Sequence, residues 1–130
     1  KEQIASMFDE KDKIIFTGFR NDAANIIKSF DIYVFASHSE GLGTVLLEAM
    51  SSKVPVVVYD NAPMNVLVKD KERGICARNL DEISLKECIL ELINEPEKAK
   101  IYSQNAFKFV DENFSHKALK EAIRNLLEQK

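Results

Sequence analysis

The chain alternates short, continuously apolar runs with longer segments in which apolar side chains recur every three or four positions. The runs at residues 31–36 and 54–59 are apolar on both faces that a strand presents, which is typical of parallel strands covered by helices on each side. Shorter apolar runs predict strands at residues 13–17 and 74–77. Gly18 ends the first of these short runs.

The segments between and after these runs have the period of amphipathic helices. In residues 81–94 the apolar side chains lie at offsets 0, 3, 4, 7 and 8 from Leu85, and residues 116–129 repeat that pattern from Leu119. Pro96 suits the first turn of the helix between them. The predicted helices comprise residues 1–9, 22–30, 43–52, 65–69, 81–94, 97–112 and 116–129.

Strands that alternate with helices and are apolar throughout predict an α/β fold, a Rossmann-like parallel sheet with helices on both faces. A length of 130 residues is most simply one domain. Sheets of this kind bind ligands at the carboxyl ends of their strands. The loop Ser37–Leu42 lies at one such end, and we therefore expect the function there.

Composition excludes several classes of function. With 45% hydrophobic and 30% charged residues the chain is globular, and its net charge of −3 lacks the basic excess of a nucleic-acid-binding protein. No apolar run has the length of a membrane span, and the first residues lack the apolar core of a signal peptide. Cys76 and Cys88 are interpreted as buried thiols of a reducing, cytoplasmic compartment, without a disulfide or metal site.

The loop after the run at 31–36 combines two glycines with a carboxylate. Gly41 and Gly43 allow close approach of a ligand to the backbone. The amides of Leu42, Gly43 and Thr44 are expected at the start of a helix, where unpaired N–H groups favour an anion such as a phosphate. Glu40 is a poor phosphate ligand but a good acceptor for hydroxyl groups. Phosphate together with hydroxyls suggests a sugar nucleotide.

A second carboxylate, Glu48, lies one turn beyond Thr44, so the two residues share a helix face. The ribose hydroxyls of a bound nucleotide are one set of donors for it. The alternative is that Glu48 bonds Ser51, Ser52 or a neighbouring amide, or reaches solvent. An ordinary strand-to-helix turn is the corresponding alternative for the glycines.

Glu40 and Glu48, separated by seven residues with Gly41-Leu42-Gly43 after the first, resemble the Glu-x7-Glu motif of retaining GT-B glycosyltransferases, specifically glycosyltransferase family 4 (group 1). Other segments are similar to that family in the same order along the chain, and the match covers nearly all of it. They are Phe16–Phe19, Phe30–Ser37, Glu48–Val57 and Lys69–Gly74.

The resemblance implies a role for each matched residue. Glu40 is the catalytic residue by this reading and holds hydroxyls of the donor sugar, while Glu48 binds the ribose hydroxyls. The donor sugar and diphosphate are contacted by Ser39, Gly41, Leu42, Gly43 and Thr44. The implied chemistry is transfer of a sugar from a nucleotide-diphosphate sugar to an acceptor hydroxyl with retention of configuration, without an obligatory metal or other cofactor.

The resemblance also implies that residues 1–130 are only part of a donor-binding domain. The first strand of that domain and the amino-terminal, acceptor-binding domain of a GT-B enzyme are expected elsewhere. By this reading the piece alone is inactive. The acceptor is expected to be a glycan or a lipid-linked saccharide of cell-surface polysaccharide or glycolipid synthesis. The full-length enzyme is expected in the cytoplasm, with peripheral association at the inner face of the membrane.

The match departs from the family at several positions. Lys53 stands where the family has glycine, and the loop Asp60–Val66 lacks the family's Gly-Gly pair and glutamate. Arg20 and His38 are basic residues near the expected site; an exposed surface position is the alternative for both, and for Arg20 it is the favoured one. Two other functions remain open: half of a sugar-nucleotide epimerase, and a non-catalytic binding module on the same fold.

Overall fold

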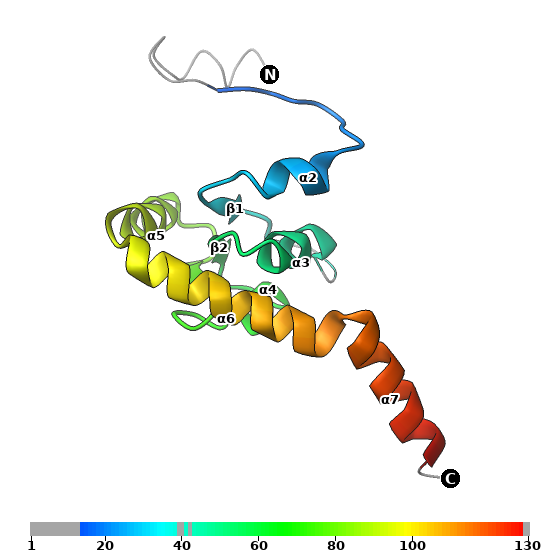
Figure 1. The fold of residues 1–130 in the computed structure, drawn as a ribbon. Helices are drawn as coiled ribbons and strands as arrows, with labels where there is room; N and C mark the ends of the chain where they lie inside the picture. Colours follow the sequence, from blue (N-terminus) through cyan, green and yellow to red (C-terminus); the bar gives the residue numbers. More distant parts are fainter. Residues whose placement is uncertain (1–13, 39–40, 42, 129–130) are drawn as a thin grey trace.

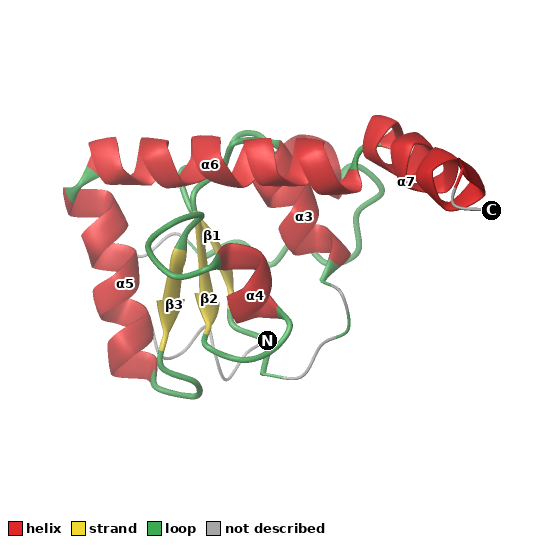
Figure 2. Cartoon of the chain, turned by 90° about the horizontal axis from the view of Figure 1, so that it is seen from below, coloured by secondary structure: helices red, strands yellow, loops and turns green. Residues whose placement is uncertain are grey.

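The computed structural model describes residues 14–38, 41 and 43–128. Three strands and six helices lie in that part of the chain; Figure 1 labels all of them except β3, which Figure 2 labels. They are α2 (Ala23–Ile27), β1 (Tyr33–Phe35), α3 (Thr44–Ser51), β2 (Val56–Tyr59), α4 (Met64–Val68), β3 (Ile75–Ala77), α5 (Glu82–Asn94), α6 (Pro96–Phe114) and α7 (His116–Glu128).

The three strands form one parallel sheet in the order β1-β2-β3. Val34 of β1 pairs with Val57 of β2, and Val58 of β2 pairs with Cys76 of β3. Figure 2 shows the strands side by side with α5 along one side of the sheet and α3 and α4 on the other. The predicted α/β fold with a parallel sheet is confirmed.

Both faces of the sheet are covered, as continuous apolar strands require. Val56 and Val58 of β2 belong to a buried cluster with residues of α2, α3, α4 and α6. Val57, between them, points to the opposite face and joins a second cluster with Leu92 of α5 and Ala99 of α6. The side chains of β2 thus point alternately into two cores. Because both cores are packed, the end of β2 and the helix that follows it are held in place.

The strand predicted at residues 13–17 is wrong for residues 14–17, which have no strand conformation. Ile15 is 81% exposed, and Phe19 beyond it is 95% exposed. Strand propensity depends on packing against a neighbour, and none of the described strands pairs with this segment. The predicted helix at residues 1–9 lies outside the described residues.

The last helix, α7, is present as predicted, but its apolar stripe is not core. Leu119, Ile123 and Leu126 are each about half exposed or more, and no residue of α7 is buried. Figure 1 shows α7 leading away from the sheet beyond the end of α6. The spacing of apolar residues therefore predicted the apolar face of α7 correctly, but it did not predict which part of the protein packs against that face.

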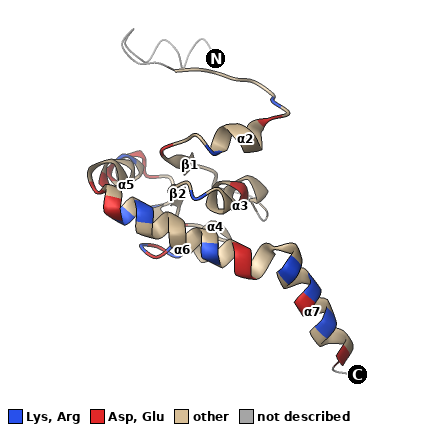
Figure 3. Ribbon diagram, viewed as in Figure 1, with Lys and Arg blue, Asp and Glu red and all other residues tan. Residues whose placement is uncertain are grey.

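Charged residues of both signs are spread over the helices (Figure 3). On α6, Lys98 pairs with Glu95 at 2.7 Å and Lys108 lies 3.8 Å from Glu112. This mixture agrees with the absence of a basic excess in the composition. Within the described residues no helix is long and apolar enough to cross a membrane.

The backbone at the end of α3 shows why glycine would suit the position of Lys53. The N–H of Val54 donates to the carbonyl of Ala49 at 3.1 Å, and the N–H of Lys53 donates to Met50 at 3.2 Å. These two bonds form a Schellman motif, in which the residue after the cap takes a left-handed conformation. Lys53 does so with φ of 59°, which a glycine adopts without steric cost.

Replacing Lys53 with glycine is therefore expected to stabilise the protein by about 1 kcal/mol, because it removes the left-handed strain of a residue with a Cβ. The gain is partly offset by loss of the Lys53 ammonium from the Phe107 ring, 4.6 Å away. Urea unfolding of Lys53→Gly beside Lys53→Ala checks this, since Lys53→Ala loses the ring contact and keeps the strain. Equal midpoints for the two variants would contradict it.

The two cysteines are free thiols, each half-buried. Burial, with smaller contributions from Asp70 and Asp60, raises the pKa of the Cys76 thiol to about 12. Burial likewise raises the pKa of Cys88. Because folding favours the protonated thiol, the stability that this contributes is complete below the ordinary thiol pKa. It is lost as the pH rises through the folded value.

Cys76 is accordingly expected to react with iodoacetamide at pH 8 at least about 100-fold more slowly in the folded protein than in 8 M urea, because the thiolate is the nucleophile. Mass spectrometry of timed samples gives both rates. Alkylation of folded Cys76 at the rate of the unfolded chain would show that its thiol is not held in the protonated form.

Candidate site at the carboxyl ends of the strands

The ends of β1 and β2 lead into α3 and α4, and these two helices lie on the same side of the sheet (Figure 2). This is the edge at which a parallel α/β sheet binds ligands. Of the residues predicted to form the site, Gly41, Gly43, Thr44 and Glu48 are described. The predicted residues Ser39, Glu40 and Leu42 lie outside the described part of the chain.

Gly43 caps α3 in a conformation that requires glycine. Its φ of 65° and ψ of 56° are left-handed, and its carbonyl accepts the N–H groups of Leu46 at 2.9 Å and Leu47 at 3.2 Å. A Cβ on residue 43 would lie 2.8 Å from Cε of Met64. Gly41, in contrast, is exposed and has no atom within 4 Å of the position of a Cβ.

The first turn of α3 has open donors. Gly43 offers no side chain to cap them, and among the described residues no acceptor bonds the N–H of Thr44 or Val45. Both residues are exposed. Unpaired amides together with the positive end of the helix dipole favour an anion. The described part of this first turn thus keeps the open amides on which the predicted anion site depends.

Glu48 lies one turn further along α3 and is exposed. Its backbone carbonyl accepts a hydrogen bond from Ser51 Oγ at 2.8 Å, but its carboxylate has no hydrogen bond or ion pair within the described residues. The carboxylate still acts at a distance: after burial, its charge is the second cause that raises the pKa of Tyr33. A side-chain bond from Glu48 to Ser51, Ser52 or a neighbouring amide is not found among the described residues, and ribose binding by its exposed carboxylate stays a prediction.

Glu48 lines a groove of about 390 Å³ between α3 and α6. Thr44 lines the same groove, so the predicted common face of the two residues is confirmed. The opposite wall was not predicted from the sequence and comes from α6 and the residue after it: Phe107, Val110, Asp111, Phe114 and Ser115. No local pattern indicates these residues, because the packing of α6 on α3 brings them to the site.

The groove is suited to hydroxyl groups. Glu48 and Asp111 supply acceptor oxygens, and the aromatic rings of Phe107 and Phe114 supply an apolar surface. Two carboxylates repel a phosphate, whereas the open amides one turn away attract it. The arrangement thus separates a place for negative charge from a place for hydroxyls along one helix.

The loop Asp60–Val66 bonds mainly to the chain itself. Asn61 Nδ2 donates to the carbonyl of Ser37 at 3.1 Å and to Asn79 Oδ1 at 3.2 Å. Asn65 Nδ2 donates to Asp60 Oδ1 at 2.9 Å, while its own Oδ1 is buried without a partner in the described part of the chain. The amide nitrogens of both asparagines are therefore occupied by structural bonds.

The two basic residues near the expected site are at the surface. Arg20 forms two bonds of 2.8 Å with the carboxylate of Asp22, which raises the pKa of Arg20 and lowers that of Asp22. His38 is exposed. Over the described ranges, no group of three or more His, Cys, Asp or Glu residues is placed to hold a metal ion.

Comparison with known proteins gives a consistent picture. The family model described as glycosyl transferases group 1 matches residues 1–109. A poly(ribitol-phosphate) alpha-N-acetylglucosaminyltransferase from Staphylococcus aureus (strain COL) is 28% identical over 131 residues, which cover 97% of this chain and 26% of that protein. The chain thus spans about a quarter of the length of this relative.

Two solved structures are similar over most of the chain. One is a mutant of S. aureus TarM in complex with Fondaparinux, alpha-GlcNAc-glycerol and UDP, with a TM-score of 0.81 and 26% identity over 97% of this chain and 26% of that one. The other is the C-terminal domain of a glycosyl transferase group 1 family protein (LpcC) from Francisella tularensis. It has a TM-score of 0.76 and 28% identity over 88% of this chain and 60% of that one.

Proposed function

Because the chain belongs to the glycosyl transferases of group 1, we propose that it binds the nucleotide-sugar donor of a retaining glycosyltransferase. One observation carries this proposal: the carboxylate of Glu48, which is exposed and has no partner among the described residues, lies one helical turn beyond the open amides and shares a groove with Thr44. Four residues of helix separate Glu48 from Thr44 by about 6 Å along the axis. That separation suits a nucleotide whose ribose and diphosphate both bind along a single helix.

In this function the diphosphate lies at the amides of Gly43, Thr44 and Val45, and Glu48 accepts hydrogen bonds from the ribose hydroxyls. Glu40 holds hydroxyls of the transferred sugar, with Ser39, Gly41 and Leu42 around it. In the reaction, the bond between the anomeric carbon and the phosphate oxygen breaks. The acceptor oxygen bonds that carbon and loses its proton, and the diphosphate leaves. The amides and dipole of α3 stabilise the charge that develops on it.

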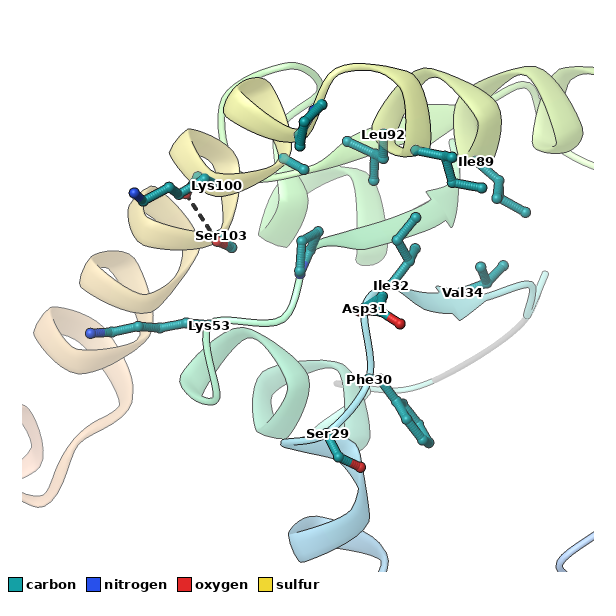
Figure 4. A pocket seen from close by; sticks show the side chains of 14 residues that line it. Ser29, Phe30, Asp31, Ile32, Val34, Lys53, Ile89, Leu92, Lys100 and Ser103 are labelled. Atoms are coloured by element: carbon teal, nitrogen blue, oxygen red, sulfur yellow. Dashed lines mark hydrogen bonds between the residues drawn. The ribbon is translucent and has the colours of Figure 1, made fainter.

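We also propose that residues 1–130 are part of a larger donor-binding domain. The supporting observation is the free edge of β1, since β2 is its sole partner in the described sheet. A mainly apolar cavity of about 970 Å³ lies beside β1, between Phe30, Ile32 and Val34 on one side and Ile89 and Leu92 of α5 on the other (Figure 4). An open edge beside an apolar cavity suits a further strand with its covering side chains.

The acceptor in this proposal is a glycan or a lipid-linked saccharide, held by an amino-terminal domain. The S. aureus relative is named for a poly(ribitol-phosphate) acceptor, which is consistent with cell-surface polysaccharide synthesis. Work at the cytoplasmic face of the membrane, by peripheral association, is part of the same proposal. Membership of a transferase family favours this function over that of a sugar-nucleotide epimerase.

Titration calorimetry of the full-length protein with UDP, GDP, ADP and their common sugars tests the proposal. One nucleotide is expected to bind, and its sugar is expected to be released or transferred slowly when the donor is incubated with the protein. If a nucleotide binds but no donor is turned over with any acceptor, the chain is a binding module. Failure of every nucleotide to bind at millimolar concentration would contradict the donor site itself.

A further inference from the structure

The segment Asp60–Met64, which joins β2 to α4, contacts the chain on both sides of the β1–α3 connection. At the β1 side, the side chain of Asn61 bonds the carbonyl of Ser37. At the α3 side, the fully buried side chain of Met64 packs against Gly43. Two residues of one short segment therefore hold the two ends of a connection that leads into the candidate site.

The Asn61 side chain links the carboxyl ends of all three described strands. Its Nδ2 donates to Ser37, which follows β1, and to Asn79, which follows β3, at 3.1 and 3.2 Å. Asn61 itself follows β2, and its backbone N–H donates to the carbonyl of Tyr59 at 2.9 Å. These bonds fix the direction of the amide, so Ser37 is held at a defined position relative to the sheet.

Met64 fixes the other end. Its Cε and Sδ lie 2.8 and 3.1 Å from the place that a Cβ on residue 43 would occupy, so the thioether lies directly against the backbone of Gly43. The helix that carries Met64 is itself anchored at its other end. The guanidinium of Arg73 donates to the carbonyls of Val66 and Leu67 at 2.8 and 2.7 Å, and lies over the Phe109 ring at 4.0 Å.

We propose that Asn61 and Met64 are positioning residues for the donor, because they set the separation between the end of β1 and the first turn of α3. This inference rests on the proposed donor site. It predicts a division of effects along the ligand. The sugar and diphosphate depend on the amides in the first turn of α3. The ribose depends on Glu48, one turn further along, where Leu46, Ala49 and Met50 bury α3 in the core.

The test compares two ligands on the full-length protein: a nucleotide-sugar and the nucleoside with the same base, which keeps the ribose and lacks the diphosphate. UDP-N-acetylglucosamine with uridine and GDP-mannose with guanosine are the probes, and the pair that binds the unmodified protein is used. Asn61→Ala and Met64→Ala are each expected to weaken binding of the nucleotide-sugar by about fivefold or more, which is about the net effect of one hydrogen bond. Binding of the nucleoside is expected to change by less than about twofold.

Three controls make the outcome specific. Asn105→Ala removes a comparable bond, from Nδ2 to the carbonyl of Glu72 at 2.9 Å, away from the site, and is expected to leave both affinities unchanged. Met64→Leu retains the packing volume and is expected to restore most of the affinity. Thermal melting identifies a variant that fails to fold, and if Met64→Ala is such a variant, the result with Asn61→Ala decides.

Equal weakening of both ligands, or no weakening of either, in the folded variants would overturn the positioning role while leaving the donor site intact. If neither the nucleotide-sugar nor the nucleoside binds the unmodified protein, the proposed function fails, and the positioning role fails with it.

Discussion

Glu48→Ala is expected to weaken nucleotide binding by about 30- to 100-fold, because a ribose held by a carboxylate makes two charge-assisted hydrogen bonds, each stronger than a neutral one. Glu48→Gln keeps the shape of the side chain with one acceptor oxygen and no charge. Its affinity is therefore expected to lie between those of the unmodified protein and Glu48→Ala. Titration calorimetry with the nucleotide that binds measures all three.

The same substitution is expected to leave stability unchanged, because the carboxylate of Glu48 is exposed and makes no bond within the described residues. Exposed substitutions of this kind alter the free energy of unfolding by less than about 0.5 kcal/mol. Glu87→Ala, at an exposed position of α5, is the matched control and is expected to keep both affinity and stability. A Glu48→Ala protein that binds the nucleotide as tightly as the Glu87→Ala protein would rule out the ribose contact.

Gly74→Ala is expected to destabilise the protein by about 3 kcal/mol, the cost of overpacking a site that cannot relax. A Cβ at this position would lie 2.6 Å from the backbone oxygen of Val56, 2.7 Å from Cγ2 of the same residue and 2.8 Å from Cγ1 of Val68. The first of these atoms belongs to the central strand. The strand would have to shift to admit the methyl group, so the clash cannot be relieved by rotating a side chain.

Urea unfolding of Gly74→Ala and Gly41→Ala gives a direct comparison. At Gly41 no atom lies within 4 Å of the position of a Cβ, so that variant is expected to unfold at nearly the same urea concentration as the unmodified protein. If Gly74→Ala and Gly41→Ala unfold at the same urea concentration, the close contact of residue 74 with β2 does not limit stability, which would contradict the prediction.

The sequence predicts best those elements whose burial is uniform. The run Val56–Val58 is apolar at every position, and β2 is buried on both faces with neighbours on each side. The start of α5 is also predictable, because Asp81 has a local acceptor that bonds the N–H of Ser84 at 2.8 Å. For β2, any apolar neighbours on both faces suffice, and for α5 the bonding partner lies only three residues away in the sequence.

Prediction fails where a distant partner decides the structure. Residues 14–17 have the composition of a strand, but a strand also needs an edge to pair with, and their sequence carries no information about one. Helix α7 is amphipathic like α5, and yet none of its residues is buried. Asp111 joins Glu48 in one groove only because α6 crosses α3, and the Asn61–Ser37 bond likewise depends on tertiary packing.

The glycine and lysine positions show the value of backbone geometry. Gly43 was predicted to matter for close approach to a ligand, and its left-handed conformation and contact with Met64 give it a structural reason as well. Lys53, a departure from the family pattern, retains the left-handed φ that suits glycine. A residue with a Cβ at this position therefore raises the energy of the turn.

Hydrogen–deuterium exchange of the full-length protein, with and without a saturating nucleotide, tests the donor site most directly. Fragmentation mass spectrometry resolves the amides of residues 43–48. The N–H groups of Thr44 and Val45 have no acceptor among the described residues, so they are expected to exchange rapidly in the free protein and at least about tenfold more slowly when a diphosphate binds them. Unchanged exchange at the first turn of α3, with protection appearing elsewhere in the saturated complex, would contradict the proposed site.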